Sequence, residues 1–159
     1  MAKIKRSQVK TYMNTTPSTS ATYSLLGDGV TSGLINMNPN VTNETYIHED
    51  NATIFVEGYA PTYPVEGTAV SGNAVFEFID TLRKNRSVLD DAETDIVNVW
   101  FYETPSGDVY PAEKQTVSIQ IDSFGGDGGQ ALKINYTINY VGDPTAGTWD
   151  VSDNAFTPS

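Results

Sequence analysis

Alternation between apolar and polar residues is the clearest pattern in this chain, and it is strongest at residues 132–140. Every second side chain there is apolar, from Leu132 to Tyr140, and the side chains between them are polar. A period of two predicts a strand with one buried face and one hydrated face. A second alternating segment, 116–121, lies upstream, and the Gly-rich stretch 122–129 can join the two as an antiparallel hairpin.

Residues 96–102 are apolar on both faces of the strand that their pattern predicts. Val97, Val99 and Phe101 fall on one face, and Ile96, Trp100 and Tyr102 fall on the other. A strand of this kind needs protein against both faces, from its own chain or from a partner. Ile96, Trp100 and Tyr102 are therefore candidate residues of a subunit interface.

Only one segment, residues 73–84, has a helical period. Its apolar residues fall at positions i, i+1, i+4 and i+7, namely Val75, Phe76, Ile79 and Leu82. Ser71 or Asn73 can cap the first turn, Asp80 and Lys84 have the spacing of an ion pair, and Asn85 suits a left-handed stop.

The remaining organisation follows from shorter patterns. Further strands are expected at residues 34–37, 45–48, 52–59 and 148–151. The polar stretch 14–24 continues a basic N-terminal segment, so residues 1–24 are expected to form an arm, followed by a single domain over 25–153 and a tail over 154–159. Strands on both sides of one helix predict a mostly β, α+β fold: a β-sandwich or a partly closed β-barrel with the helix on its flank.

Composition favours a sheet and narrows the possible chemistry. The 159 residues include 19 Thr, 14 Val, 10 Ile and 9 Tyr but only 6 Leu and 11 Ala, a usage that suits pleated surfaces better than helices. The absence of Cys excludes thiol chemistry and thiolate zinc sites. A catalytic triad or a multi-His metal site would have to be built around the single histidine, His48.

Charge is unevenly distributed along the chain. Four of the nine basic residues, Lys3, Lys5, Arg6 and Lys10, lie in the first ten positions, and from residue 11 onward 5 basic residues face 20 acidic ones, a balance of −15. Such a surface repels phosphate, which argues against nucleic-acid binding outside the N-terminal arm. The arm has no apolar run typical of a signal peptide, and no stretch is long enough to span a membrane, so we expect a soluble protein that is intracellular when synthesised.

Three acidic segments are candidate sites of chemistry. Residues 122–129 carry potential oxygen ligands, as calcium-binding loops do, but they lack the EF-hand ligand spacing. A flexible hairpin loop is the alternative interpretation. Residues 90–95 hold four carboxylates that either bind a cation or form a solvated loop. His48 with Glu49 and Asp50 lacks a nucleophile at a defined spacing, which favours a surface histidine. We therefore expect no catalytic residue, no metal site and no cofactor.

Six stretches of the chain together carry a family resemblance. They are residues 46–69, 76–84, 91–96, 115–129, 134–138 and 141–144, within a region that covers most of residues 40–150. In these stretches the sequence resembles the major tail tube proteins of long-tailed, siphovirus-type bacteriophages of Gram-positive hosts.

The resemblance implies a structural virion protein with no enzymatic activity. Such proteins assemble in the cytoplasm of the bacterial host into stacked hexameric rings, a homo-oligomeric tube located in the virion tail. The implied partners are a tape-measure protein, a tail terminator and baseplate proteins. Double-stranded DNA passes through the tube during ejection without sequence-specific binding, and no membrane partner is implied.

Residue-level physics agrees with this interpretation. An acidic lumen lets DNA slide without sticking, and the balance of −15 fits that requirement. Residues 96–102 offer a surface for ring closure. The N-terminal cations Lys3, Lys5, Arg6 and Lys10, together with a long loop over residues 36–52, are expected to bridge adjacent rings by meeting acidic patches of the next subunit.

Two other classes of function stay open from the residues alone. A monomeric carbohydrate-binding or adhesin module would use aromatic side chains to stack on sugars, with Trp100, Trp149, Tyr59 and Tyr63 as candidates. A hydrolase would require a pair of carboxylates at a defined separation in a cleft, and no spacing in the sequence recommends one.

Overall fold

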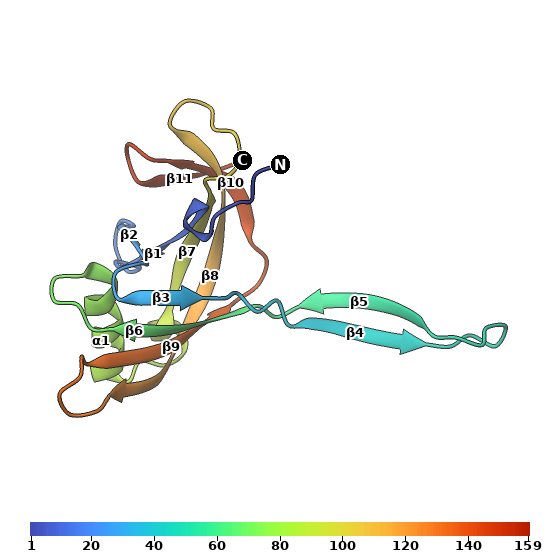
Figure 1. Cartoon of the computed structure of the whole chain (residues 1–159), viewed down its shortest axis with the longest axis horizontal. Coiled ribbons are helices and arrows are strands. Elements are labelled where there is room, and N and C mark those ends of the chain that lie inside the picture. The colour runs from blue at the N-terminus through green and yellow to red at the C-terminus, as the bar shows by residue number, and fades with distance from the viewer.

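The computed structural model describes residues 1–159 and consists of a β-rich body from which one long hairpin projects (Figure 1). The strands are β1 (Val9–Asn14), β2 (Tyr23–Leu25), β3 (Val30–Gly33), β4 (Pro39–Glu44), β5 (Thr53–Tyr59), β6 (Thr62–Thr68), β7 (Glu93–Trp100), β8 (Val109–Gly125), β9 (Lys133–Tyr140), β10 (Thr145–Asp150) and β11 (Ala155–Pro158). The helices are α1 (Ala74–Asn85) and two 3-10 turns, η1 (Arg6–Gln8) and η2 (Leu89–Ala92). The predicted class, mostly β with one α-helix, is confirmed. No helix combines the length and the apolar character needed to cross a membrane.

Nine strands form one antiparallel sheet, and two form a separate ribbon. The main path runs β2-β1-β7-β8-β9-β6-β3, with β10 paired to β8 and β11 paired to β10. Strands β4 and β5 pair only with each other and make the projecting hairpin. The predicted antiparallel pairing of 116–121 with 132–140 is confirmed as part of the β8–β9 ladder.

Strand β8 is the backbone of the body because it changes partner along its length. One edge of β8 pairs with β7, while the other pairs with β10 over residues 109–114 and with β9 from Val117 onward. The sheet therefore forks at the two residues between these ladders. The side chain of Gln115 links β8 to the segment between β9 and β10. It is 2% exposed, and its Nε2 donates to the carbonyl oxygens of Val141 at 2.8 Å and Gly142 at 3.2 Å.

The two faces of β7 contribute to two different hydrophobic cores. The larger core lies between the sheet and α1 and contains Met13, Tyr63, Val65, Val75, Ile79, Leu82, Ile96, Val117, Ile119, Ile134, Tyr136 and Ile138. The smaller core contains Val97, Val99, Ala112 and Trp149, and the Trp149 ring stacks on that of Tyr12 with centroids 4.4 Å apart. The predicted covering of both faces of residues 96–102 thus comes largely from the chain itself. Ile96 is fully buried, which removes it from the candidate subunit interface.

Helix α1 begins and ends for identifiable reasons. Its N-cap is Asn73, whose side chain accepts a hydrogen bond from the N–H of Phe76 at 3.0 Å. Its apolar face buries Val75, Ile79 and Leu82 against the sheet. The left-handed residue at its end is Arg86, with φ of 47°, rather than Asn85 as predicted.

Parts of both predicted terminal extensions belong to the sheet instead. Strand β1 lies between β2 and β7, and its Met13 is fully buried, so residues 9–14 are not part of an arm. The sequence pattern does not predict this strand because polar residues occupy some of its buried positions. Buried Thr11 donates to Oδ1 of Asn98 at 2.7 Å, and Thr94 donates to the carbonyl of Asn14 at 2.6 Å. At the other end, residues 155–158 form β11 rather than a free tail.

The region between β3 and β5 also differs from the prediction. Residues 34–37 form no strand beyond an isolated bridge from Asn36 to Thr62, and residues 45–48 lie in the turn of the projecting hairpin. The first strand of that hairpin, 39–44, was missed because Pro, Asn and Glu dominate it, residues that are depleted in strands.

Replacing Gln115 by Met is expected to destabilise the protein, because the volume is kept while the carbonyls of Val141 and Gly142 lose the hydrogen bonds that a buried side chain donates. A hydrogen bond contributes about 0.5–1.5 kcal/mol, and chemical denaturation should detect a loss of that order for each bond. Gln120→Met on the same strand is the control, since Gln120 is exposed and should change stability by less than about 0.5 kcal/mol. Equal effects of the two substitutions would contradict a special role for the fork.

Candidate assembly surface

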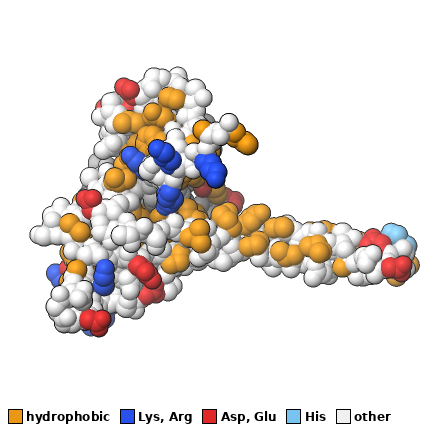
Figure 2. Space-filling model, in the orientation of Figure 1, with side chains coloured by type: hydrophobic (Ala, Val, Ile, Leu, Met, Phe, Trp, Pro, Cys, Tyr) orange, Lys and Arg blue, Asp and Glu red, His pale blue; other side chains and the backbone are white.

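The projecting hairpin, residues 39–59, carries apolar side chains that nothing in the chain covers. Val41 pairs with Val56 and Asn43 with Ile54, so Val41, Val56 and Ile54 share one face of the ribbon. Ile54 is 65% exposed and Val56 is 52% exposed. Figure 2 shows hydrophobic side chains continuing from the body along this hairpin.

The hairpin is fixed where it leaves the body. Asn38, with φ of 45°, donates from Nδ2 to the carbonyl of Ala60 at 3.1 Å and to Oγ1 of Thr62 at 3.2 Å. Beyond Asn38, the register of the β4–β5 ladder shifts between Asn40 and Val41. Bulges of this type add twist to a two-stranded ribbon.

Exposure of this face has an energetic consequence. An isolated two-stranded hairpin is marginally stable in water, and contiguous exposed apolar patches on soluble proteins mark interaction surfaces. The body supplies no third strand for β4 or β5. The projecting hairpin therefore has the properties of an element that another protein surface covers.

The hairpin tip, residues 44–53, is acidic and also presents an exposed apolar residue. Its side chain contacts are local: the Tyr46 hydroxyl donates to Glu44 at 2.9 Å, and the Thr53 hydroxyl donates to Glu49 at 2.8 Å. Ile47 is completely exposed. His48 lies at this tip with a side chain 77% exposed, 3.5 Å from Glu49, as predicted for a surface histidine.

A groove of about 440 Å³ lies where the hairpin joins the body, and we call it the root groove. Its lining includes Met37, Tyr59, Trp100, Glu113 and Tyr140. The structure thus brings Tyr59 and Trp100, two of the four aromatic residues considered as candidates for stacking on sugars, to one surface. Burial raises the pKa of Tyr140 to about 12, although a hydrogen bond from Asn98 acts in the opposite direction.

Glu113 is an unpaired carboxylate in the root groove. Partial burial raises the pKa of its side chain above the ordinary value, and none of the three ion pairs of the protein includes it. The lining residue Asp143 is also acidic, so the groove offers negative charge beside apolar surface. A cation from another molecule would complement this site.

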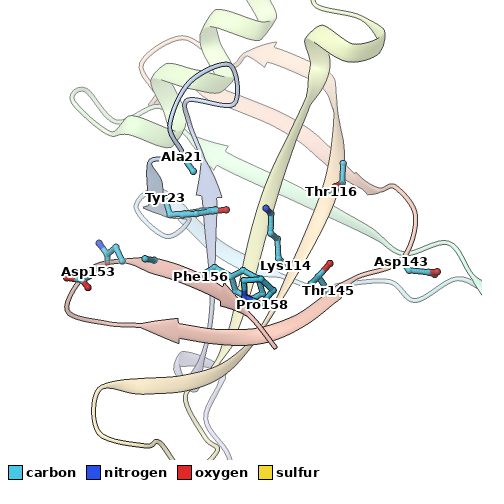
Figure 3. Close-up of a pocket in the computed structure, with 11 residues that line it drawn as sticks. Ala21, Tyr23, Lys114, Thr116, Asp143, Thr145, Asp153, Phe156 and Pro158 are labelled. Atoms are coloured by element: carbon cyan, nitrogen blue, oxygen red, sulfur yellow. The ribbon is translucent and has the colours of Figure 1, made fainter.

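The opposite face of β8 lines a second, more polar hollow of about 530 Å³ (Figure 3). Alternation along β8 places Lys114 and Thr116 here, while Glu113 and Gln115 face the root groove. Tyr23, Thr145, Phe156 and Pro158 are among the other lining residues, and Asp153 and Asp143 lie on opposite sides of the view in Figure 3. One lysine among scattered polar groups does not form a catalytic arrangement.

Nothing in the structure gathers ligands for a metal ion. No group of three or more His, Asp or Glu side chains is close enough together to hold one. Asp122, from the predicted calcium-like stretch, lies in β8 and accepts hydrogen bonds from Gln120 and Thr137. The acidic stretch 90–95 is divided between η2 and β7, and Asp95 accepts hydrogen bonds from Tyr23 and Asn14.

The N-terminal cations fall into two groups. Arg6 donates to the Tyr63 hydroxyl at 3.1 Å and to the carbonyl of Val9 at 2.8 Å, and Lys10 lies 5.2 Å from the ring centroid of Phe101. These two are engaged within their own chain. Lys3 and Lys5 make no side-chain contact of this kind and are exposed. Tyr102, which with Trp100 makes up the aromatic part of the candidate interface, is 42% exposed.

Sequence reasoning missed the apolar face of the projecting hairpin. Residues 36–52 were predicted to be a loop, and 52–59 an ordinary strand of the body. One signal was available: Ile54, Phe55 and Val56 place apolar side chains on both faces of a strand, the same pattern that drew attention to residues 96–102.

Comparison with known proteins identifies the fold. Neither a protein-family model nor a curated protein sequence matches the chain. A chain from the tail of an empty GTA particle with C6 symmetry has a TM-score of 0.63 and 10% identity, with coverage of 90% of this chain and 98% of that chain. A chain from the sixfold-symmetrised baseplate of the anti-feeding prophage has a TM-score of 0.48 and 11% identity, with coverage of 92% and 97%. The first of these two likenesses shows that the chain shares its fold with a tail protein.

Replacing Glu113 by Gln is expected to stabilise the protein at neutral pH. A carboxyl whose pKa is raised on folding favours the folded state fully below its unfolded pKa of 4.5, and this contribution is lost as the pH rises through the folded pKa. The melting temperature at pH 7 should therefore rise by about 1–2 °C in the variant, and the difference should vanish near pH 4. A lower melting temperature for Glu113→Gln at pH 7 would contradict an unpaired carboxylate.

Proposed function

We propose that the protein is a structural, non-enzymatic tail tube subunit that self-assembles into stacked rings. The observation that carries the proposal is the projecting hairpin: its apolar face is uncovered in the single chain, on a body whose fold occurs in a tail protein. A second copy of the chain is the partner that a homo-oligomeric tube supplies.

Ring geometry gives each part of this surface a role. In a closed ring each subunit presents one surface to its neighbour on one side and a different surface on the other. The hairpin is one such surface, and a body surface of the next copy receives it. We propose six subunits per ring, in line with the C6 symmetry of the GTA tail whose fold the chain shares.

The finer assignment follows the sequence resemblance. We propose a virion tail of the siphovirus type in a phage of a Gram-positive host, assembled in the host cytoplasm with a tape-measure protein, a tail terminator and a baseplate. The net charge of −11 supports a conduit for DNA ejection, because an acidic wall does not retain the phosphate backbone.

The burial of aromatic residues disfavours the carbohydrate-binding alternative. Trp149 is fully buried and Tyr63 is 3% exposed, so two of the four candidate stacking residues are inaccessible to a sugar. Tyr59 and Trp100 remain in the root groove. A glycan array would test this directly, and we expect no binding.

Purified protein is expected to form hollow tubes or rings when it is concentrated at moderate salt, which screens repulsion between acidic subunits. Negative-stain electron microscopy and analytical ultracentrifugation are the measurements. A particle that stays at 17.3 kDa at every concentration and salt condition would contradict self-assembly.

Variants of the projecting hairpin provide the matched test. Ile54→Ser together with Val56→Ser should change the free energy of unfolding by less than about 0.5 kcal/mol per site, because both side chains are already exposed, yet it should abolish tubes. Thr42→Ser, on the other face of the ribbon, is the control and should assemble normally. Normal assembly of the double variant would exclude the apolar face from the interface.

The free N-terminal cations are proposed to stabilise contacts between rings. Deleting residues 2–5 removes Lys3 and Lys5 but leaves η1 and β1 in place, so the fold should be kept while tubes become shorter and more sensitive to salt. Tube length by electron microscopy at 50 and 500 mM salt measures this. Unchanged length and salt response would refute the role of this segment.

A further inference from the structure

A second basic region lies at the end of α1, far along the chain from the N-terminal cations. Arg83, Lys84 and Arg86 border a hollow of about 630 Å³, whose lining also includes Leu82, Ile121 and Phe124. We call this surface the helix corner. Three of its lining residues are cationic and none is acidic.

The charges of the helix corner are only partly neutralised within the chain. Asp80 pairs with Arg83 at 2.7 Å and with Lys84 at 3.1 Å, so one carboxylate serves two cations. Arg86 is exposed and has no ion pair. The corner therefore keeps an excess of positive charge on a protein with a net charge of −11.

The helix corner also has exposed apolar surface. The guanidinium of Arg83 lies 3.7 Å from the ring centroid of Phe124, which holds the side chain over the ring. Phe124 is 43% exposed. A hollow lined by cations and apolar groups suits a ligand that is acidic and carries an apolar side chain.

The hairpin tip has the complementary composition. It presents Glu49 and Asp50 beside the completely exposed Ile47, and the chain has no Lys or Arg between Lys10 and Arg83. In Figure 1 the hairpin leads away from the body on the side opposite α1, so the tip is remote from the helix corner of its own chain. Any contact between the two is therefore between copies.

We propose that the hairpin tip of one subunit docks on the helix corner of a second subunit. Ile47 packs against the apolar groups of the corner, and Glu49 and Asp50 pair with Lys84 and Arg86. The inference rests on the proposed function in so far as copies must associate, and it adds the receiving surface. The free N-terminal lysines are the alternative acceptor, but they lie in an exposed extension and line none of the larger hollows.

Charge exchange between the two surfaces tests the proposal. The corner variant combines Lys84→Glu with Arg86→Glu, and the tip variant combines Glu49→Lys with Asp50→Lys. Each variant should raise the critical concentration for sedimentable tubes on the order of tenfold, because close charge pairs are lost. The variant that combines all four substitutions should recover most of the loss. Lys114→Glu with Lys133→Glu and Asp90→Lys with Asp91→Lys match the two changes in net charge and serve as controls, because none of these residues belongs to a proposed contact.

The outcomes separate this proposal from the function on which it rests. Tubes that form normally from the corner variant, or a tip variant rescued by Lys3→Glu with Lys5→Glu instead, would overturn the docking site while leaving the tube function intact. Zero-length carbodiimide coupling of concentrated wild-type protein is an independent readout: we expect intermolecular coupling of Lys84 to Glu49 or Asp50 by mass spectrometry. Assembled protein that couples Lys3 or Lys5 to the tip, and not Lys84, would also overturn it.

Discussion

The partner exchange along β8 is the constraint on which the rest of the body depends. Because one strand pairs with β10 in its first part and with β9 in its second, the chain between those two strands must leave the sheet, exposing carbonyl groups that need a donor. Gln115 supplies that donor from the buried face of the fork. The same exchange lets β7 and β8 build two cores and places the root groove and the polar hollow on opposite faces of β8.

The body and the projecting hairpin satisfy their backbones and side chains to different extents. In the body, hydrogen bonding of the buried polar atoms is nearly complete: among buried side-chain nitrogens and oxygens, only Nε1 of Trp149 lacks a hydrogen-bond partner. In the hairpin the backbone of each strand is paired on one edge alone, and the apolar face is hydrated. The free energy to be gained by covering the apolar face of the hairpin is therefore available for association.

Local pattern predicted those elements whose burial follows a simple period. The α1 helix with its Asn73 cap and the β8–β9 pairing could be inferred because one face is apolar and the other is wet. Strand β1 could not, since its buried positions include Thr11 and Asn14, which are satisfied by partners about 80 residues away. The root groove was equally inaccessible from sequence, because Met37, Trp100 and Glu113 come together only through the tertiary fold. Ile96 shows the reverse limit: an apolar residue on a two-faced strand is as well explained by a core as by an interface.

Electrostatics decides how such a subunit can recognise copies of itself. A net charge of −11 repels any approaching copy, and this repulsion acts at all orientations until it is screened. The few unpaired cations then have an influence beyond their number, because orientations that bring them against carboxylates are the only ones in which the repulsion is locally reversed. Clustering those cations at the N-terminal segment and at the helix corner restricts the favourable orientations to a small set. In the proposed ring, the apolar hairpin surface would supply affinity without fixing orientation, whereas the sparse cations would fix orientation, and a ring that closes after a fixed number of subunits requires both.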